Sequence, residues 1–505
     1  MSCTTMLVGK AASYDGSTIT ARDEDCGSDA NDPKRLVVVH PDEQPRHYKS
    51  VNSHCEVDLP DDPLRYTAAP EANLKDGIWA ASGINEANVG MDGTETIDNN
   101  ERVLGADPMV ELVPAKGKPG EEGHAPEVPG GLGEEDFVTL VLPYIRSARE
   151  GVQRLGEQLE RYGTYECNGI AFSDVDEVWW METIGGHHWI ARRVPDDCYV
   201  TMPNQLGIDS FDLADAEGAQ LEHMASADLR EFIAKNHLDL QFREPDDPGD
   251  VINPRIVFGT ASDSDHIYNT PRAWAMQRFL NPHSNTWDGP DADYRPEDDD
   301  IPWCRVPERK ITIEDVKYAL SLHYQGTPYD PYGKAGDASQ RGRYRCIGLN
   351  RNSQLSVQQI RPYMPESCRA IHWQAMGSTI YNALVPIYAN VDDIPAYLRD
   401  TTTRVTSENH YWHIRIIAAL ADAHFASCQQ HVERYQLAVG SKAHAHVIAT
   451  DARAADLSYA DAAPVLGEAN EAMVAFLKDE TDKLLDRVLK QVTVAMRSAF
   501  SREDA

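Results

Sequence analysis

Residues 3–9 read Cys-Thr-Thr-Met-Leu-Val-Gly, and residues 17–23 read Ser-Thr-Ile-Thr-Ala-Arg-Asp. Both runs are rich in β-branched residues, and the polar segment between them contains Asp15-Gly16, so the pattern predicts a β-hairpin. Paired residues of an antiparallel hairpin have a constant sum of residue numbers. A turn centred between about 12.5 and 15.5 therefore places Cys3 opposite a residue between about 22 and 28. Arg22 and Asp25 are expected close to Cys3.

The rest of the chain divides into a sheet-rich part and a helical part. Further short β-branched runs, separated by Gly, Pro, Asn and Asp, fill most of the first half, and helical patterns lie between them. One helix is predicted to start with Thr270 as its hydroxyl cap and Pro271 in its first turn, which projects Arg272 from that turn. From about residue 402 long periodic helices dominate. The Pro/Gly-rich stretch at 114–133 is expected to be a surface loop. We expect a mixed α and β fold with a C-terminal helical extension.

Composition and charge exclude several classes of function. The chain has 505 residues, with 47 Lys and Arg against 81 Asp and Glu and a formal charge of −34, so nucleic acid is not an expected partner. No run reaches the roughly 18 to 20 apolar residues of a membrane helix, and a signal peptide is not evident. The nine cysteines are dispersed without a Cys-x-x-Cys motif, which argues against a disulfide framework or a structural zinc site. These features predict a cytoplasmic protein without a membrane partner.

Cys3 occupies a position with a specific chemical use. Near a chain terminus a cysteine is ordinarily just a small residue, but as the N-terminal residue it carries a thiol nucleophile and an amine base together. A free α-amine has a pKa of about 7.7–8.0, so near neutral pH it accepts the thiol proton. Removal of Met1 leaves Ser2 in place, so this chemistry requires a further cleavage between Ser2 and Cys3, which is expected to be autocatalytic. No metal or other cofactor is needed.

Several ordered motifs carry a family resemblance. They are Cys3-Thr4-Thr5, Asp15-Gly16-Ser17, the run at 21–25, Asn85-Glu86, the run at 93–96, Trp179-Trp180-Met181-Glu182, Met202-Pro203-Asn204-Gln205 and Asn269-Thr270-Pro271-Arg272. In this order they resemble dipeptidase A, the cysteine dipeptidases of the N-terminal nucleophile hydrolase superfamily, which is related to penicillin V acylase and bile-salt hydrolase. The resemblance covers roughly residues 3–395. It implies a four-layer αββα sandwich and hydrolysis of dipeptides with a free N-terminus.

The resemblance also implies a domain division and catalytic roles. Residues 3–400 correspond to the hydrolase domain, residues 1–2 to a short propeptide and residues 401–505 to the helical extension. Cys3 corresponds to the nucleophile, Arg22 to the group beside the thiol and Asp25 to the carboxylate that orients the α-amine. Asn204 corresponds to an oxyanion donor, joined by a backbone N–H near residue 95, and Arg272 completes the polar network.

Recognition of a dipeptide needs an acidic partner for its ammonium group and a basic partner for its carboxylate. Glu95 is the candidate for the ammonium, and an arginine is expected for the carboxylate. In the related acylases the corresponding position looks like an asparagine. The resemblance to them therefore implies a role for the backbone at this position, but none for the Glu95 side chain. The binding role of Glu95 is therefore a hypothesis about this chain.

Other interpretations of the sequence stay open. The same fold and nucleophile could hydrolyse a non-peptide acyl amide, or a secernin-like scaffold could keep the fold without turnover. His424, Cys428 and His431 share one helical face and could form a metal site, although packing is the simpler interpretation. Glu182 has no assigned role. The amphipathic C-terminal helices also make a homo-oligomer plausible.

Overall fold

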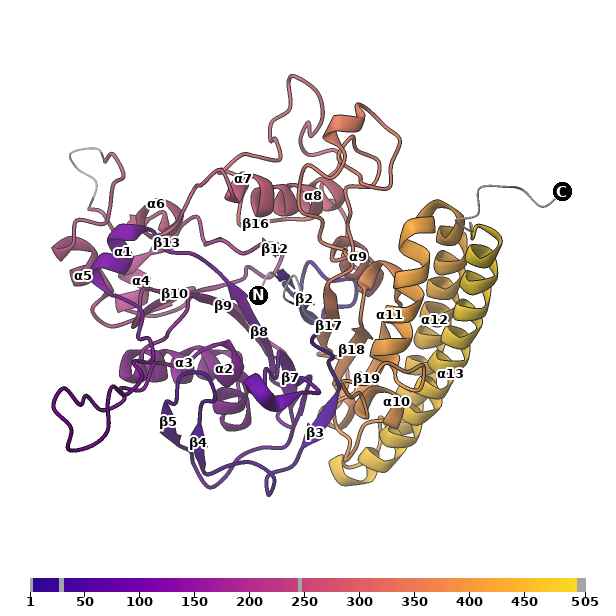
Figure 1. Cartoon of the computed structure of the whole chain (residues 1–505), viewed down its shortest axis with the longest axis horizontal. Coiled ribbons are helices and arrows are strands. Elements are labelled where there is room, and N and C mark those ends of the chain that lie inside the picture. Colours follow the sequence, from indigo (N-terminus) through magenta and orange to yellow (C-terminus); the bar gives the residue numbers. More distant parts are fainter. Residues whose placement is uncertain (1–2, 27–30, 244–247, 497–505) are drawn as a thin grey trace.

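The computed structural model describes residues 3–26, 31–243 and 248–496, apart from the side chains of Thr94 and Glu95. Within these residues the chain forms two large sheets, and every strand pairing in them is antiparallel. The sheets face each other where β2 contacts β8 and β9, as can be followed in Figure 1. The prediction of a mixed α and β fold with a C-terminal helical segment is confirmed.

The first sheet contains the N-terminal hairpin at its centre. In spatial order its strands are β16 (Cys304–Arg305), β12 (Tyr199–Met202), β1 (Thr4–Val8), β2 (Thr18–Asp25), β17 (Asn352–Ile360), β18 (Ala370–Met376) and β19 (Val385–Tyr388). The second sheet runs in the order β14 (His223–Ala225), β11 (His188–Arg193), β10 (Val178–Ile184), β9 (Asn168–Ser173), β8 (Gly90–Thr96), β7 (Ser82–Asn85), β6 (Tyr66–Ala68) and β3 (Val37–Val39). Two small ribbons pair β4 (His47–Lys49) with β5 (Glu56–Asp58) and β13 (Phe211–Asp212) with β15 (Val251–Ile252).

The register of β1 and β2 confirms the predicted hairpin. Thr4 pairs with Asp23 and Thr5 pairs with Arg22, so the residue numbers of each pair sum to 27. Extending this register by one residue puts Cys3 opposite Glu24, inside the predicted interval. β1 therefore delivers Cys3 to the centre of the first sheet, next to β2.

The space between the two sheets is unusually polar. Thr20 donates to Gln358 on β17 at 3.4 Å, and Gln358 donates to the backbone oxygen of Met91 on β8 at 2.8 Å. His372 on β18 lies 3.4 Å from the Ser82 hydroxyl on β7. Because side chains alternate along a strand, the opposite face of the first sheet carries apolar residues such as Val357. The polar groups thus meet between the sheets, and the apolar face is left for helices to cover.

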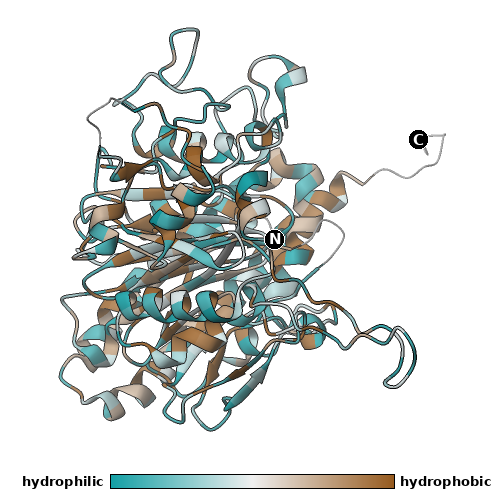
Figure 2. Cartoon of the chain, turned by 90° about the vertical axis from the view of Figure 1, so that its left-hand side faces the viewer, coloured by the Kyte–Doolittle hydropathy of each residue, from teal (hydrophilic) through white to brown (hydrophobic). Residues whose placement is uncertain are grey.

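Helices cover the outer faces of both sheets. α2 (Glu134–Val141) contacts β8, and α3 (Ala148–Tyr162) contacts β8 to β11, while α11 (His410–Ala421) contacts β18 and the long helices α12 (Phe425–Ala454) and α13 (Tyr459–Val494) contact β19. Figure 2 shows hydrophobic and hydrophilic residues alternating along the helices. α3 begins after a Ser147 cap and ends at Tyr162, directly before Gly163. Its buried residues recur every three or four positions.

The remaining helices are short. They are α1 (Glu101–Ala106), α4 (Leu213–Glu217), α5 (Leu229–Lys235), α6 (Pro254–Phe258), α7 (Asp265–Tyr268), α8 (Thr270–Leu280), α9 (Ile313–Ala319), α10 (Ala396–Arg399) and the 3-10 turns at Leu74–Asp76, Leu142–Tyr144, Ala338–Gln340, Glu366–Cys368, Thr379–Tyr381 and Asp422–His424. None of the helices in the described part of the chain is both long and apolar enough to cross a membrane. One hydrophobic cluster joins Ile371 of β18 with Leu477 of α13.

A buried ion pair fastens α12 to the first sheet. Arg361, directly after β17, donates to the Asp451 carboxylate at 2.6 and 3.0 Å, and the Tyr388 hydroxyl donates to the same carboxylate at 2.8 Å. The Arg361 side chain is only 1% exposed. Loss of one partner of a buried ion pair leaves a charge that water cannot reach.

We predict that Asp451→Ala lowers the free energy of unfolding by about 3–5 kcal/mol. Urea unfolding followed by circular dichroism measures this loss. Asp456→Ala is the matched control, because Asp456 is an exposed carboxylate in the turn after the same helix. Equal stability of the two variants contradicts the prediction.

Candidate active site

Cys3 lies directly before β1 and is fully buried. Arg22 on β2 donates from Nη2 to the Cys3 sulfur at 2.8 Å. The pairing of Thr5 with Arg22 makes this contact possible, because side chains of residues 3 and 5 leave a strand on the same face. A guanidinium at this distance favours the thiolate form of a cysteine. The two residues that the hairpin was predicted to bring together are in direct contact.

Arg22 also binds the carboxylate of Glu134, a residue of the helix α2 that packs against the second sheet. Its Nη2 donates to Glu134 Oε1 at 2.6 Å, and Glu134 is the first residue of α2. The Glu134 backbone N–H donates in turn to Glu166 at 2.7 Å. Burial, followed by the nearby charge of Glu134, raises the pKa of Glu166 to about 7. Hydrogen bonds therefore connect the Cys3 thiol through Arg22 and Glu134 to Glu166.

Two further acids surround the Arg22 guanidinium. Glu24 lies 4.0 Å from Arg22 Nη1 and forms an ion pair of 2.8 Å with Lys34. Asp92 on β8 is fully buried, and neither of its carboxylate oxygens has a hydrogen-bond partner among the described residues. Burial raises the pKa of Asp92 to about 8, although the positive charge of Arg22 opposes this shift. Asp92 is therefore mostly neutral at pH 7.

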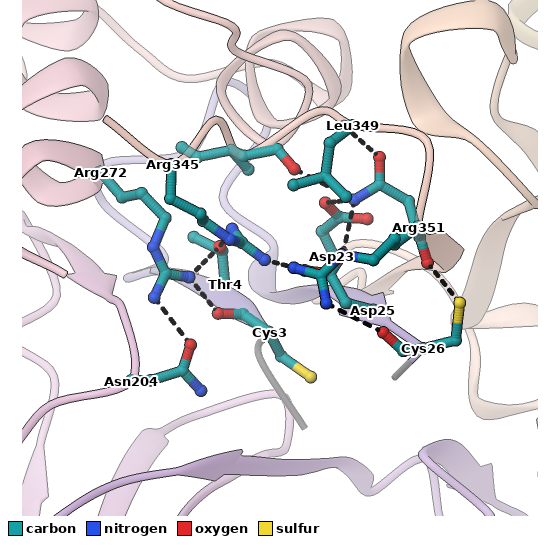
Figure 3. Close-up of polar contacts among 12 residues, drawn as sticks. Cys3, Thr4, Asp23, Asp25, Cys26, Asn204, Arg272, Arg345, Leu349 and Arg351 are labelled. Carbon is teal, nitrogen blue, oxygen red and sulfur yellow. Dashed lines mark hydrogen bonds and ion pairs between the residues drawn. The ribbon is translucent and has the colours of Figure 1, made fainter. Parts of the chain in front are cut away.

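Arg272 holds the backbone of the same cysteine. Its Nη1 donates to the carbonyl oxygen of Cys3 and, at 2.7 Å, to the Thr4 hydroxyl, while its Nη2 donates at 2.7 Å to Asn204 Oδ1 (Figure 3). Arg272 projects from the first turn of α8, as predicted. The predicted cap is wrong by one residue, because Asn269 occupies the cap position and Thr270 donates to Pro296 instead.

Asn204 lies in the loop that follows β12. Because its Oδ1 accepts from Arg272, its amide nitrogen faces the other way and donates to the Thr96 carbonyl at 2.9 Å. Glu182, to which the sequence assigned no role, supports this loop: its carboxylate accepts from the backbone N–H groups of Gly207 and Ile208 at 2.6 and 3.2 Å. The orientation of the Asn204 amide is thus set from both sides.

The Asp25 carboxylate forms an ion pair with Arg345 and accepts from Asn352 at 2.7 Å. Arg345 also reaches the Thr4 hydroxyl at 3.4 Å, so Asp25 belongs to the network at the start of β1 (Figure 3). The Glu95 side chain lies outside the described residues. The Glu95 backbone pairs with Gly169 at an irregularity of β8.

Sequence reasoning missed Glu134, Arg345 and Asp92. The glycine-rich run before Glu134 was the signal that could have indicated this residue. We predicted a surface loop for that run. Residues 130–133 are instead buried, and a Cβ at Gly133 would lie 2.2 Å from the Tyr165 ring. Nothing local in the sequence marks Arg345 or Asp92.

The described residues contain no group of three or more His, Cys, Asp or Glu side chains placed to hold a metal ion. Of the face formed by His424, Cys428 and His431, Cys428 is buried in the hydrophobic cluster beneath α12. Packing therefore accounts for the position of this cysteine.

Comparisons with known proteins place the chain in a family. The chain matches the model of peptidase family C69 over residues 2–438, which makes it a hydrolase of peptide bonds. The protein belongs to peptidase family C69. It is 58% identical to a dipeptidase of Bifidobacterium longum and 48% identical to a probable dipeptidase A of Streptococcus pyogenes, in both cases across the full length of both chains. It is 43% identical to a probable dipeptidase B of Lactococcus lactis, over its own full length and 98% of that protein.

The buried Asp92 predicts a pH dependence of stability. Its pKa is raised from 3.8 to about 8, so between these values the folded protein keeps a proton that the unfolded chain has lost. Stability therefore falls as the pH rises through this window. Asp92→Asn cannot titrate, so its unfolding free energy should not fall in this way. The unfolding free energy of Asp92→Asn minus that of the parent should therefore rise by up to about 1.4 kcal/mol per pH unit.

The measurement is the unfolding free energy of both proteins at several pH values from 5 to about 8. Asp61→Asn, at a side chain that is 98% exposed, removes a carboxylate without this effect. A constant stability difference between Asp92→Asn and the parent across the pH range contradicts the prediction.

Proposed function

We propose that this protein hydrolyses dipeptides with a free N-terminus, with Cys3 as the nucleophile after cleavage of the peptide bond before it. The observation that carries the proposal is the 2.8 Å contact between Arg22 and the Cys3 sulfur in a buried site. The substrate class is supported by the relatives, which are named dipeptidases. The proposal includes the four-layer αββα fold of N-terminal nucleophile hydrolases, supported by two facing sheets with helices on their outer faces.

The first step is attack by sulfur. The Cys3 thiol proton moves to the α-amine of the same residue, and the thiolate forms a bond to the carbonyl carbon of the dipeptide. The electron pair of the carbonyl moves to its oxygen. The Arg22 guanidinium stabilises the negative charge on sulfur before attack, and Glu134 on the other side of Arg22 keeps that guanidinium in place.

The oxyanion is the next charge to be stabilised. Asn204 is the proposed donor, because Arg272 occupies its oxygen and so turns the amide N–H groups away. A backbone N–H near residue 95 is proposed as the second donor. When the carbon–nitrogen bond breaks, the protonated α-amine gives its proton to the leaving amino acid.

Water completes the reaction. The α-amine takes a proton from a water molecule, the resulting hydroxide attacks the thioester carbon, and the carbon–sulfur bond breaks to regenerate the thiolate. We propose that Asp25 orients the amine, since Cys3 lies opposite Glu24 in the extended register and Asp25 is the next residue along β2. The bonds of Asp25 to Arg345 and Asn352 support this role because they fix its carboxylate.

The N-terminus of the active protein tests the nucleophile. We predict that intact-mass spectrometry finds a chain beginning at Cys3, and that Cys3→Ala keeps the residues before position 3. Deletion of Ser2 puts Cys3 directly after Met1, so routine methionine removal exposes it and should give full activity without a dedicated cleavage. Iodoacetamide should label Cys3 and abolish activity. A fully active chain that begins at Ser2 contradicts the mechanism.

Substitution of Asn204 tests the oxyanion role. Asn204→Ala should lower kcat about 100-fold to 1,000-fold, with a much smaller change in KM, because the contact forms only as negative charge develops. Gln205→Ala is the matched control: this neighbouring amide donates to the Thr260 carbonyl at 3.1 Å. Steady-state kinetics on one dipeptide measures both variants. An unchanged kcat in Asn204→Ala contradicts the oxyanion role of Asn204.

A further inference from the structure

A cavity of about 250 Å³ opens beside the proposed oxyanion donor. It is lined by Thr96, Asp98, Asn204, Ser262, Ser264, Asp265, Tyr268 and Asn269. We infer that this cavity binds the α-ammonium group of the substrate and that Asp98 is the carboxylate that pairs with it. The inference rests on the proposed function and names a specificity-determining residue for it.

Asn204 connects this cavity to the nucleophile. Its side chain lines the cavity, and its oxygen accepts from the same Arg272 that donates to the Cys3 carbonyl. Tyr268 also lines the cavity, and the guanidinium of Arg272 stands over its ring at 5.4 Å. A group bound in the cavity is therefore close to the place where the scissile carbonyl meets Asn204. In a dipeptide the α-ammonium is separated from that carbonyl by a single carbon atom.

Hydrogen bonds hold both neighbours of Asp98 in the chain. Ile97 donates its N–H to the Cys167 carbonyl at 3.0 Å, and Asn99 accepts from the Gly185 N–H at 2.5 Å. Both flanking side chains are buried, whereas Asp98 is exposed to the cavity side. Among the described residues no hydrogen bond or ion pair engages the Asp98 carboxylate. The segment thus presents one uncompensated carboxylate at a fixed position.

The opposite wall reinforces the negative potential. Asp265 there is buried and accepts from the Thr260 hydroxyl, from the N–H and hydroxyl of Ser262 and from the Asn269 amide at 2.6–3.0 Å. These bonds commit its oxygens to the loop, but its charge remains. Partial removal of water around the Asp98 carboxylate, followed by the nearby charge of Asp265, raises the pKa of Asp98. None of the residues that line the cavity is basic.

A cation that enters the cavity relieves this repulsion. An ammonium group brings one positive charge and three N–H donors, which suit the Asp98 carboxylate and the neighbouring hydroxyl groups of Ser262 and Ser264. A substrate carboxylate faces two negative charges in the same place. The cavity therefore discriminates between the two ends of a dipeptide, and it selects the end that carries the amine.

Kinetics on paired substrates tests the inference. Asp98→Asn should raise KM for alanyl-alanine about tenfold to a hundredfold, since a charged hydrogen bond is replaced by a neutral one, with a small change in kcat. N-acetyl-alanyl-alanine, which lacks the ammonium group, should inhibit the parent and Asp98→Asn with the same inhibition constant. Asp98→Glu should recover part of the loss, and Asp61→Asn should behave as the parent. A KM for alanyl-alanine that is unchanged in Asp98→Asn overturns the inference.

A binding measurement separates this inference from the proposed function. Cys3→Ala, expressed with methionine directly before residue 3, cannot form the thioester but keeps the cavity. Calorimetric titration with alanyl-alanine should show binding that Asp98→Asn weakens by a similar factor. Equal affinity with and without Asp98, or no binding to Cys3→Ala, overturns the role of Asp98. Failure of the parent to hydrolyse any dipeptide contradicts the proposed function, whereas the titration still decides the role of Asp98.

Discussion

The Arg22 guanidinium is buried between two sheets, and much of the surrounding structure compensates its charge. A buried charge that loses its partner costs several kcal/mol, so the groups that meet Arg22 cannot move independently. These groups come from different elements: the Cys3 sulfur precedes β1, Glu24 belongs to β2 and Glu134 begins α2. The position of the thiol is consequently tied to the position of a helix on the far side of the second sheet.

The alternation of side chains along β2 places two different sets of charged contacts on the two faces of the strand. Arg22 and Glu24 point between the sheets, whereas Asp23 and Asp25 lie on the other face and bind Asn352 there. β17 follows the same rule, with Ser356 among the polar groups on the inner face and Val357 in the hydrophobic cluster. The Cys3 sulfur and its contact with Arg22 therefore lie between the sheets, and helices pack on the outer face of the first sheet.

The sequence was sufficient for those parts of the site that depend on local geometry. The hairpin rule placed Arg22 near Cys3, and the Thr270-Pro271 signal placed Arg272 in a first helical turn. Glu134 could not be found in this way, because it is 112 residues from Arg22 and the two meet only when the sheets stack. The sequence does not mark Asp98 either. Its inferred role depends on a cavity that Asp98 lines together with residues between Ser262 and Asn269, which are distant in sequence.

Two arginines hold Cys3 from opposite ends, and this arrangement bears on how the protein could be activated. Arg22 binds the sulfur, while Arg272 binds the carbonyl oxygen, so neither contact involves the amide nitrogen of Cys3. Cleavage of the bond before Cys3 changes that nitrogen alone. The sulfur, Asn204 and the cavity beside it can therefore keep their positions when the amine is exposed, because the groups that locate them lie on the C-terminal side of the broken bond.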